Sequence, residues 1–85
     1  MEILWQPKAT KQLKKIGDRK LRARIVKVVA GLESFPDCQG IKLLTNHKYD
    51  YRLRVGDWRI LFDLIDGMPV IISIEEVRKR DERTY

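Results

Sequence analysis

The sequence predicts an α+β domain in which an N-terminal strand and an antiparallel helical hairpin precede a mostly antiparallel, twisted sheet. Two observations carry this prediction. Apolar residues recur at helical spacing between residues 9 and 32, whereas residues 49–77 contain three runs typical of β-strands. Helices that follow one strand and precede several others are expected to cover one face of the sheet. The 85 residues form a single domain, 1–85, because so short a chain cannot bury two cores.

The first half of the chain supplies the expected strand and the two helices. Residues 2–6 are β-type and end at Pro7, which cannot donate to a strand ladder but is accepted in the first turn of a helix. The first helix therefore follows Pro7 and ends near Gly17. Asp18 is a good N-cap residue for a second, longer amphipathic helix. The connection between the helices is too short for anything but an antiparallel hairpin.

The second half of the chain supplies the sheet. Its three β-type runs are 49–55, 58–65 and 68–77, and a brief strand around residues 41–44 precedes them. Gly56-Asp57 separates the first two runs, and Asp66-Gly67 between the last two is a strong signal for a two-residue hairpin loop. An antiparallel meander is the expected result.

The hairpin YRLRVGDWR carries an unusual amount of positive charge for two strands. Side chains alternate between faces, so Arg52 and Arg54 share one face with Asp50, whereas Tyr49 shares the other with Tyr51, Leu53 and Val55. A two-residue loop places Arg54 directly opposite Arg59. Such a like-charge pair costs roughly a few tenths of a kcal/mol or more. We therefore expect an anion to bind there. The alternative is that the arginines extend into water or that Asp50 and Asp63 neutralise them.

The excess of basic residues indicates which classes of partner suit this protein. Eighteen Lys and Arg against twelve Asp and Glu give a net charge of +6 and a pI near 9.7, which suits a partner rich in phosphate, or an acidic protein. Small basic proteins are also often merely soluble. Cys38 is the single cysteine and His47 the single histidine, so neither an intramolecular disulfide nor a Cys/His zinc site is expected. A cytoplasmic protein without membrane association, metal or other cofactor is predicted.

The charged C-terminus is expected to reach the arginine-bearing face of the sheet. It starts where the last strand ends, and its candidate side chains are Arg78, Lys79, Arg80, Arg83 and Tyr85. Cations within about 4–6 Å of a phenol favour its phenolate form, which is the form required of a general base. The alternative is a disordered basic tail without a function, and composition alone favours that alternative.

Alternation also predicts an apolar patch beside the arginines, formed by Leu61, Ile72 and Ile74, which is typical of a partner site. The same alternation sends the adjacent Glu75 and Glu76 to opposite faces and so places Glu75 on the helix-covered face. A β-bulge or an early strand end near Ser73 would remove that conflict.

The order of elements, together with YRLRVGDWRILF and the C-terminal IEEVRKRDERTY, resembles the RelE/ParE superfamily of toxin–antitoxin toxins over essentially the whole chain. The most specific motifs are Trp58-Arg59-Ile60-Leu61-Phe62 and the Lys-Arg-Asp/Glu cluster a few residues before the terminal Tyr. The resemblance implies the RelE-like microbial RNase fold. For the RelE-type branch it implies cleavage of mRNA in the ribosomal A site, where the 2′-OH attacks the adjacent phosphate without a metal.

The resemblance also implies roles for individual residues. Arg59 matches the arginine that holds the scissile phosphate, Arg80 the arginine that neutralises developing charge, and Tyr85 the general base. Arg52 and Arg54 match paired basic residues, here both arginine instead of lysine, which keeps the charge but excludes proton transfer. The expected catalytic set is Arg54, Arg59, Arg80 and Tyr85, and the expected RNA-binding set is Arg52, Arg78, Lys79 and Arg83.

The resemblance leaves two targets open. ParE-type members share the fold, lack the catalytic set and inhibit DNA gyrase. The presence of the arginines together with Tyr85 favours the RNase branch. The expected partners are the ribosome, mRNA and a cognate antitoxin, encoded nearby, that forms a hetero-oligomeric complex with the toxin and covers the apolar patch or the arginines.

Overall fold

The computed structural model describes residues 1–80. Its elements in chain order are β1 (Glu2–Trp5), α1 (Pro7–Lys14), α2 (Arg19–Ala30), the 3₁₀ turn η1 (Gly31–Ser34), β2 (Ile41–Leu43), β3 (Tyr51–Val55), β4 (Trp58–Ile65) and β5 (Ile71–Lys79). The predicted α+β class and the predicted order of elements are confirmed.

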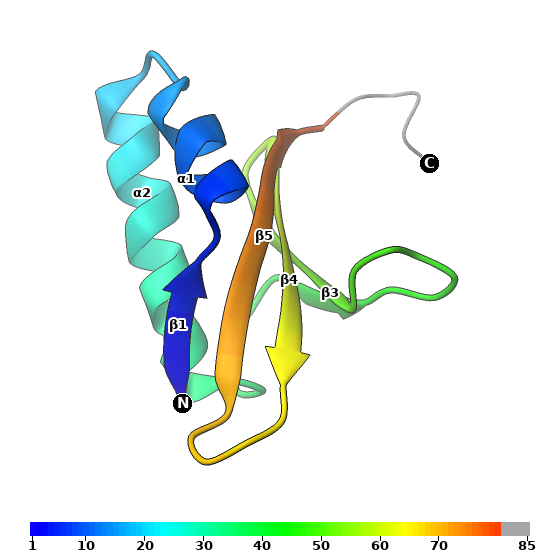
Figure 1. Cartoon of the computed structure of the whole chain (residues 1–85). Helices are drawn as coiled ribbons and strands as arrows, with labels where there is room; N and C mark the ends of the chain where they lie inside the picture. Colours follow the sequence, from blue (N-terminus) through cyan, green and yellow to red (C-terminus); the bar gives the residue numbers. More distant parts are fainter. Residues whose placement is uncertain (81–85) are drawn as a thin grey trace.

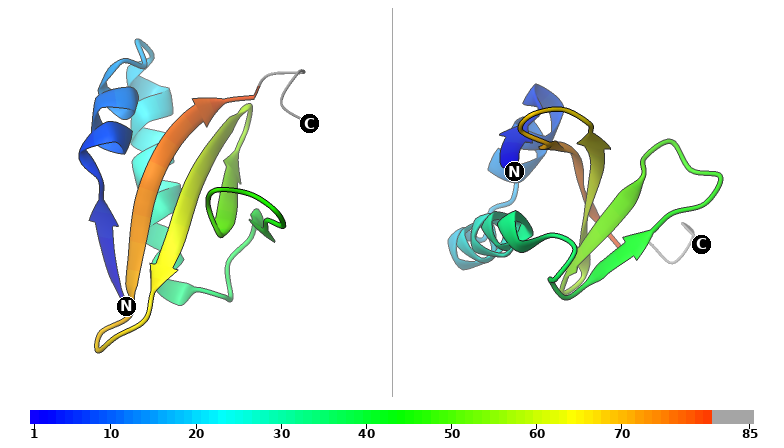
Figure 2. Two further views of the ribbon diagram at one scale, coloured as in Figure 1. Left: turned by 45° about the vertical axis from the view of Figure 1, so that its right-hand side comes forward. Right: turned by 90° about the horizontal axis from the view of Figure 1, so that it is seen from below.

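The five strands form one twisted sheet in the order β1-β5-β4-β3-β2 (Figure 1). β1 runs parallel to β5, and all the other neighbours are antiparallel. The helices lie against one face of this sheet, and the loop between β2 and β3 projects on the side away from them (Figure 2). We call the face without helices the open face. By register, it carries the side chains of Arg54, Arg59 and Arg78.

Local sequence explains where the helices begin. Pro7 occupies the first turn of α1, where a missing N–H removes no hydrogen bond. Asp18 caps α2, since its carboxylate accepts the backbone N–H groups of Lys20 at 2.9 Å and Leu21 at 3.1 Å. These two signals fix where each helix of the predicted hairpin begins.

The core lies between the helices and the sheet. Its fully buried side chains include Ile25, Val29 and Leu32 from the helical layer and Ile60, Phe62, Ile72 and Ile74 from the sheet. Phe62 stacks on Tyr51 at a centroid distance of 5.4 Å, and Phe35 packs edge-on against both rings. Aromatic pairs in these geometries add to the energy of simple burial.

Two strand boundaries differ from those predicted. Ile65 pairs with Ile71, so the loop between β4 and β5 spans residues 66–70 and is not the two-residue turn expected at Asp66-Gly67. Pro69 explains this difference, because a residue without an N–H cannot continue the ladder of an internal strand. In addition, β3 begins at Tyr51 and not at Tyr49, so the direction of the Tyr49 side chain is not determined by the alternation along β3.

Candidate phosphate-binding site

Three arginines stand in one row across the open face. Arg54 of β3 lies opposite Arg59 of β4, as the two-residue loop predicts, and Arg59 in turn lies opposite Arg78 of β5. Neighbouring strands are about 4.8 Å apart, so the row spans roughly 10 Å. Like charges placed directly opposite one another repel. An anion bound between them would convert that repulsion into attraction.

The three arginines of this row differ in exposure. Arg54 and Arg78 at its ends are exposed, whereas Arg59 at its centre is half-buried, and its Nε and Nη1 atoms are buried. Electrostatic attraction is stronger where water is partly excluded. Arg59 is therefore the member of the row best placed to bind an anion tightly, and its exposed neighbours can adapt to the shape of a ligand.

The hairpin turn positions Arg80 beside this row. Gly56 adopts φ +57°, a conformation that glycine reaches at little cost, and Asp57 completes the loop. The backbone N–H of Arg80 donates to the Asp57 carbonyl at 2.6 Å, directly after β5 ends. The start of the C-terminal tail thus lies next to the turn that connects Arg54 and Arg59, as the sequence predicts.

A second row on the same face adds two further cations. Lys42 of β2 pairs with Arg52 of β3, which pairs with Leu61 of β4, which pairs with Glu76 of β5. Arg52 is half-buried, and its guanidinium donates to the Gly40 carbonyl at 3.3 Å. Sequence reasoning did not single out Lys42, although alternation from the short strand at 41–44 would have placed it there.

Lys79 lies on the other side of the sheet from Arg52 and Arg78, two of the other predicted RNA-binding residues. It pairs with Trp58, whose face is the one covered by the helices. Arg78, one residue earlier, is on the open face, so the two adjacent cations point to opposite sides of the sheet.

A β-bulge in β5 decides which side chains reach the open face. Leu61 pairs with Glu76 but Phe62 pairs with Ile74, so Glu75 is an extra residue in β5. After the bulge the alternation is reset, and Arg78 joins the arginine row when strict alternation from Ile74 would have sent it to the core. The bulge anticipated as a resolution for Glu75 is therefore present. It also corrects the expectation that Glu75 and Glu76 lie on opposite faces, because the Glu75 carboxylate accepts the Ser73 hydroxyl of the open face.

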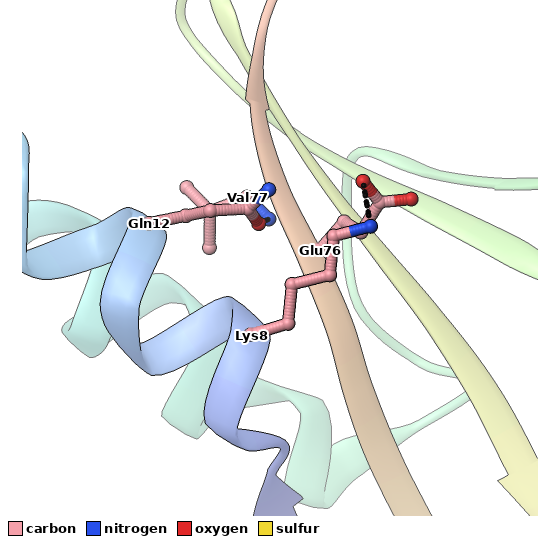
Figure 3. A network of polar contacts seen from close by, with 4 residues as sticks. All are labelled: Lys8, Gln12, Glu76 and Val77. Atoms are coloured by element: carbon pink, nitrogen blue, oxygen red, sulfur yellow. Dashed lines mark hydrogen bonds and ion pairs between the residues drawn. The ribbon is translucent and has the colours of Figure 1, made fainter.

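Helix α1 holds the edge of β5 at this bulge. β1 ends at Trp5, opposite Ile74, so the next residues of β5 have no strand beside them on that edge. The side-chain oxygen of Gln12 accepts the Val77 N–H at 2.7 Å, and Lys8 pairs with the Glu76 carboxylate at 3.1 Å (Figure 3). These contacts satisfy a backbone donor and a nearly buried carboxylate that the bulge would otherwise leave without partners.

Tyr49 crosses onto the open face and binds the same carboxylate. Alternation placed it with Tyr51 on the core face, but its buried hydroxyl donates to Glu76, and the reason is that β3 starts only at Tyr51. Burial, the hydrogen bond to Glu76 and the nearby negative charge raise the pKa of Tyr49 to about 12. Burial alone would raise the pKa of Glu76, but the hydrogen bonds from Tyr49 and Lys8, together with the charges of Lys8 and Arg78, hold that pKa below its usual value.

The predicted apolar patch on the arginine face is wrong. Ile72 and Ile74 belong to the core beneath the helices because the loop of residues 66–70 is longer than expected and places them opposite Leu64 and Phe62, and Leu61 is on the open face but only 2% exposed. Asp63, proposed as a neutralising partner, lies opposite Ser73 and accepts the Asp50 N–H at 2.8 Å. Its carboxylate is thus directed to the loop before β3.

Two predicted site residues, Arg83 and Tyr85, lie outside the described residues. Within residues 1–80, no group of three His, Cys, Asp or Glu side chains is arranged to hold a metal ion. In the same part of the chain, no helix has both the length and the apolar character needed to cross a membrane.

Comparison with known protein families shows to which family the chain belongs. The family model for the ParE toxin of the type II toxin–antitoxin system, parDE, matches residues 3–84. The chain belongs to this family. This protein is thus the toxin component of a type II toxin–antitoxin system, and it belongs to the RelE/ParE superfamily that the sequence resembles.

Solved structures confirm the fold of the toxin. It superimposes on the YoeB/ParE toxin from Agrobacterium tumefaciens with a TM-score of 0.75 and 11% identity, covering 95% of this chain and 100% of the other. A chain of the RelB–RelE antitoxin–toxin complex from Methanococcus jannaschii gives a TM-score of 0.66 and 24% identity, with 89% and 88% covered. No curated protein matches the toxin in sequence.

Proposed function

We propose that this toxin is a metal-independent endoribonuclease that cleaves mRNA on the ribosome and so inhibits translation. The observation that supports this proposal is the row Arg54–Arg59–Arg78, next to which the backbone of Arg80 is held. A row of guanidinium groups suits the phosphates of an RNA strand, because each can donate two parallel hydrogen bonds to a phosphate.

In the proposed reaction, Arg59 holds the scissile phosphate, and Arg80 faces the charge that develops on it. A base removes the proton of the 2′-OH, the 2′ oxygen bonds to phosphorus, and the bond from phosphorus to the 5′ oxygen breaks. The products are a 2′,3′-cyclic phosphate and a 5′-OH, which takes up a proton. Tyr85 is proposed as the base, and the arginines stabilise the transition state electrostatically.

The remaining cations of the open face are proposed to bind the RNA on either side of the cleaved bond. Arg52, Arg54 and Arg78 lie on the open face by register, and Arg83 of the tail is assigned to the same role by resemblance. Lys79 does not enter this proposal, because its strand register directs it to the opposite face.

Mapping of mRNA 5′ ends on translating ribosomes tests the proposal. We expect new 5′ ends with the toxin and a loss of cleavage of roughly 100-fold or more for Arg59→Ala and Arg80→Ala, because each removes charge stabilisation at the transition state. Lys20→Ala, on the exposed surface of α2, is the matched control and should cleave normally. Intact messages during growth arrest would exclude the proposal. Cleavage at the wild-type rate by both arginine variants would show that the site is misplaced.

Tyr85→Phe tests the proposed base separately, because it removes only the hydroxyl. We expect cleavage by this variant to fall while binding of uncleaved RNA is retained. Cleavage at the wild-type rate would mean that another group takes the proton.

A second candidate function is inhibition of DNA gyrase without nuclease activity, which the description of the matching family as ParE toxins favours. In that case supercoiling by purified gyrase would be blocked while mRNA stayed intact.

Under either function we propose that a cognate antitoxin binds and neutralises the toxin. The description of the family as part of a toxin–antitoxin system supports this proposal.

A further inference from the structure

Glu76 places a carboxylate beside the cations of the open face. The cations of its two rows are Lys42, Arg52, Arg54, Arg59 and Arg78. Glu76 and Arg78 follow the bulge of β5 two residues apart, so their side chains leave the same face about 7 Å from each other along the strand. An arginine side chain can span this distance. An ion pair between Arg78 and Glu76 is therefore within reach, and it would compete with a phosphate for the guanidinium group.

Two other groups occupy the Glu76 carboxylate. The Nζ atom of Lys8 lies 3.1 Å from its Oε1 atom, and the hydroxyl of Tyr49 donates a hydrogen bond to the same carboxylate. Lys8 extends to it from α1 (Figure 3), and Tyr49 reaches it from the loop before β3. Arg78 is exposed and forms no ion pair within residues 1–80. The carboxylate is thus paired with the helix and the loop, and not with its neighbour on the same strand.

The cost of an uncompensated carboxylate gives this arrangement its importance. Glu76 is 9% exposed, and a nearly buried charge is unfavourable unless hydrogen bonds and an opposite charge compensate it. Burial by itself would raise the pKa of Glu76, whereas the hydrogen bonds from Tyr49 and Lys8 and the charges of Lys8 and Arg78 lower that pKa. Arg78 thus already acts on the carboxylate through its charge. When Tyr49 or Lys8 is removed, a closer approach of Arg78 restores the lost compensation.

We propose that Tyr49 and Lys8 are positioning residues of the phosphate-binding site. By binding the Glu76 carboxylate, they keep it from forming an ion pair with Arg78, and the Arg78 guanidinium remains available for a phosphate of the RNA. Neither of the two side chains touches the phosphate in this arrangement. The ligand named here rests on the proposed function, whereas the ion pair that the two residues prevent is a property of the toxin alone.

The first experiment measures the Arg78 side chain in the toxin without a ligand. NMR follows hydrogen exchange of the Arg78 Nε–H group, whose signal is assigned by its loss in Arg78→Lys. Tyr49→Phe removes the hydroxyl, and Lys8→Met removes the ammonium group but keeps an unbranched side chain. We expect exchange in both variants to slow at least about threefold, because an ion pair with Glu76 protects the donor. Lys11→Met, at an exposed residue of α1, makes the same change in charge as Lys8→Met and should leave the exchange unchanged.

The second experiment measures binding of a single-stranded RNA 12-mer whose 2′-O-methyl groups prevent cleavage. We expect Tyr49→Phe and Lys8→Met to bind this RNA roughly threefold to fivefold more weakly, because a partly exposed ion pair now competes for one phosphate contact. The slope of log affinity against log salt concentration should become shallower by up to about 0.7, the value for one phosphate contact of a single strand. Lys11→Met should change the affinity by less than about twofold.

A second substitution, Glu76→Gln, separates positioning from a purely structural role. It removes the charge that attracts Arg78, but it does not restore the contact that either single variant has lost. We therefore expect Tyr49→Phe/Glu76→Gln and Lys8→Met/Glu76→Gln to bind the RNA within about twofold of Glu76→Gln alone. Glu33→Gln, at an exposed carboxylate of η1, is the matched control and should not restore binding.

The outcomes distinguish this inference from the proposed function. Unchanged Arg78 exchange in both single variants would overturn the inference, and so would wild-type RNA affinity in both, or weakened binding that Glu76→Gln does not restore. Circular dichroism and thermal melting establish whether each variant is folded. The Lys8 side chain is 58% exposed, so Lys8→Met carries the test if Tyr49→Phe is unfolded. A wild-type toxin that does not bind RNA would instead contradict the proposed function, and the Arg78 exchange then supports or overturns the inference by itself.

Discussion

At the scale of single residues, Tyr49 and Glu76 connect three separate parts of the chain. Glu76 belongs to β5, Tyr49 to the loop before β3, and Lys8 to α1, and all three meet at one carboxylate. This carboxylate lies beside the arginine row, since Glu76 is two residues from Arg78. The network is well suited to hold the loop of residues 44–50 against the open face.

Removal of the Tyr49 hydroxyl should weaken the fold in a pH-dependent way. Tyr49→Phe is expected to lower the free energy of unfolding at neutral pH by about 1.5–3 kcal/mol, the usual range for a hydrogen bond to a charged group. The pKa of Tyr49 is raised from 10.0 to about 12 in the folded state, so its stabilising effect is complete below pH 10 and is lost as the pH rises from 10 towards 12.

Urea unfolding of both proteins between pH 7 and pH 11.5 measures this effect. The difference in free energy between wild type and Tyr49→Phe should shrink above pH 10. A difference that stays constant up to pH 11.5 would contradict the assigned contact between the hydroxyl and Glu76.

At the scale of elements, local sequence predicts the β3–β4 hairpin outright, whereas it offers the β5 bulge only as one of two ways to place Glu75. The pairing of Arg54 with Arg59 follows from a two-residue loop, and the loop follows from Gly56 and Asp57 alone, so local sequence determines it. The bulged strand is bound by Gln12, 65 residues away from its partner Val77. Alternation along one strand contains no information about such a distant contact. In the sequence, the bulge is indicated by the adjacent Glu75 and Glu76 within an apolar run.

The same distinction explains which side chains local sequence places on the correct face of the sheet. Hairpin register places Arg54 opposite Arg59, and the position of Arg80 after the last strand places its backbone beside the hairpin turn. Periodicity extended two residues before the true start of β3 predicts the wrong face for Tyr49. Lys79 is expected to bind RNA because of its charge, but charge alone does not determine the face of a strand.

Gln12 is expected to stabilise the bulged strand through its side-chain oxygen. Gln12→Leu leaves the Val77 N–H without its acceptor and should cost about 1–3 kcal/mol of stability. It should also speed hydrogen exchange at the Val77 amide, and NMR measures both this exchange and the Arg59–Arg78 register. Gln12→Glu keeps an acceptor oxygen and should preserve the protection of Val77. Equal protection in Gln12→Leu would show that the helix does not hold this edge.

At the scale of the whole molecule, charge is distributed unevenly between the two layers. The helical hairpin carries +8 and the remainder of the chain is net negative, so the layers attract one another while the cations within the hairpin repel. Many of these cations are exposed and belong to two short helices. Their mutual repulsion is therefore sensitive to the ionic strength of the solution.

The free energy of unfolding is accordingly expected to rise with salt. Because screening acts most on exposed like charges, an increase from 20 mM to 500 mM NaCl should stabilise the toxin by roughly 1 kcal/mol, as measured by urea unfolding. The double variant Lys11→Glu/Lys20→Glu, at one exposed residue of each helix, reverses two of these charges and should show a smaller increase. A fall in stability with salt would mean that attraction between the layers outweighs repulsion within the hairpin.

The pairing of the first strand with the last has a consequence for synthesis of the toxin. Within residues 1–80, the strand partner of β1 is β5, since Glu2 pairs with Ile71 and Trp5 with Ile74, so the sheet is incomplete until β5 has been translated. The arginine row is also completed late, because Arg78 is the last of its three arginines to be translated. Contacts this distant in sequence form late in folding. A partly synthesised toxin therefore lacks the complete arginine row, which can form only after β5 has left the ribosome.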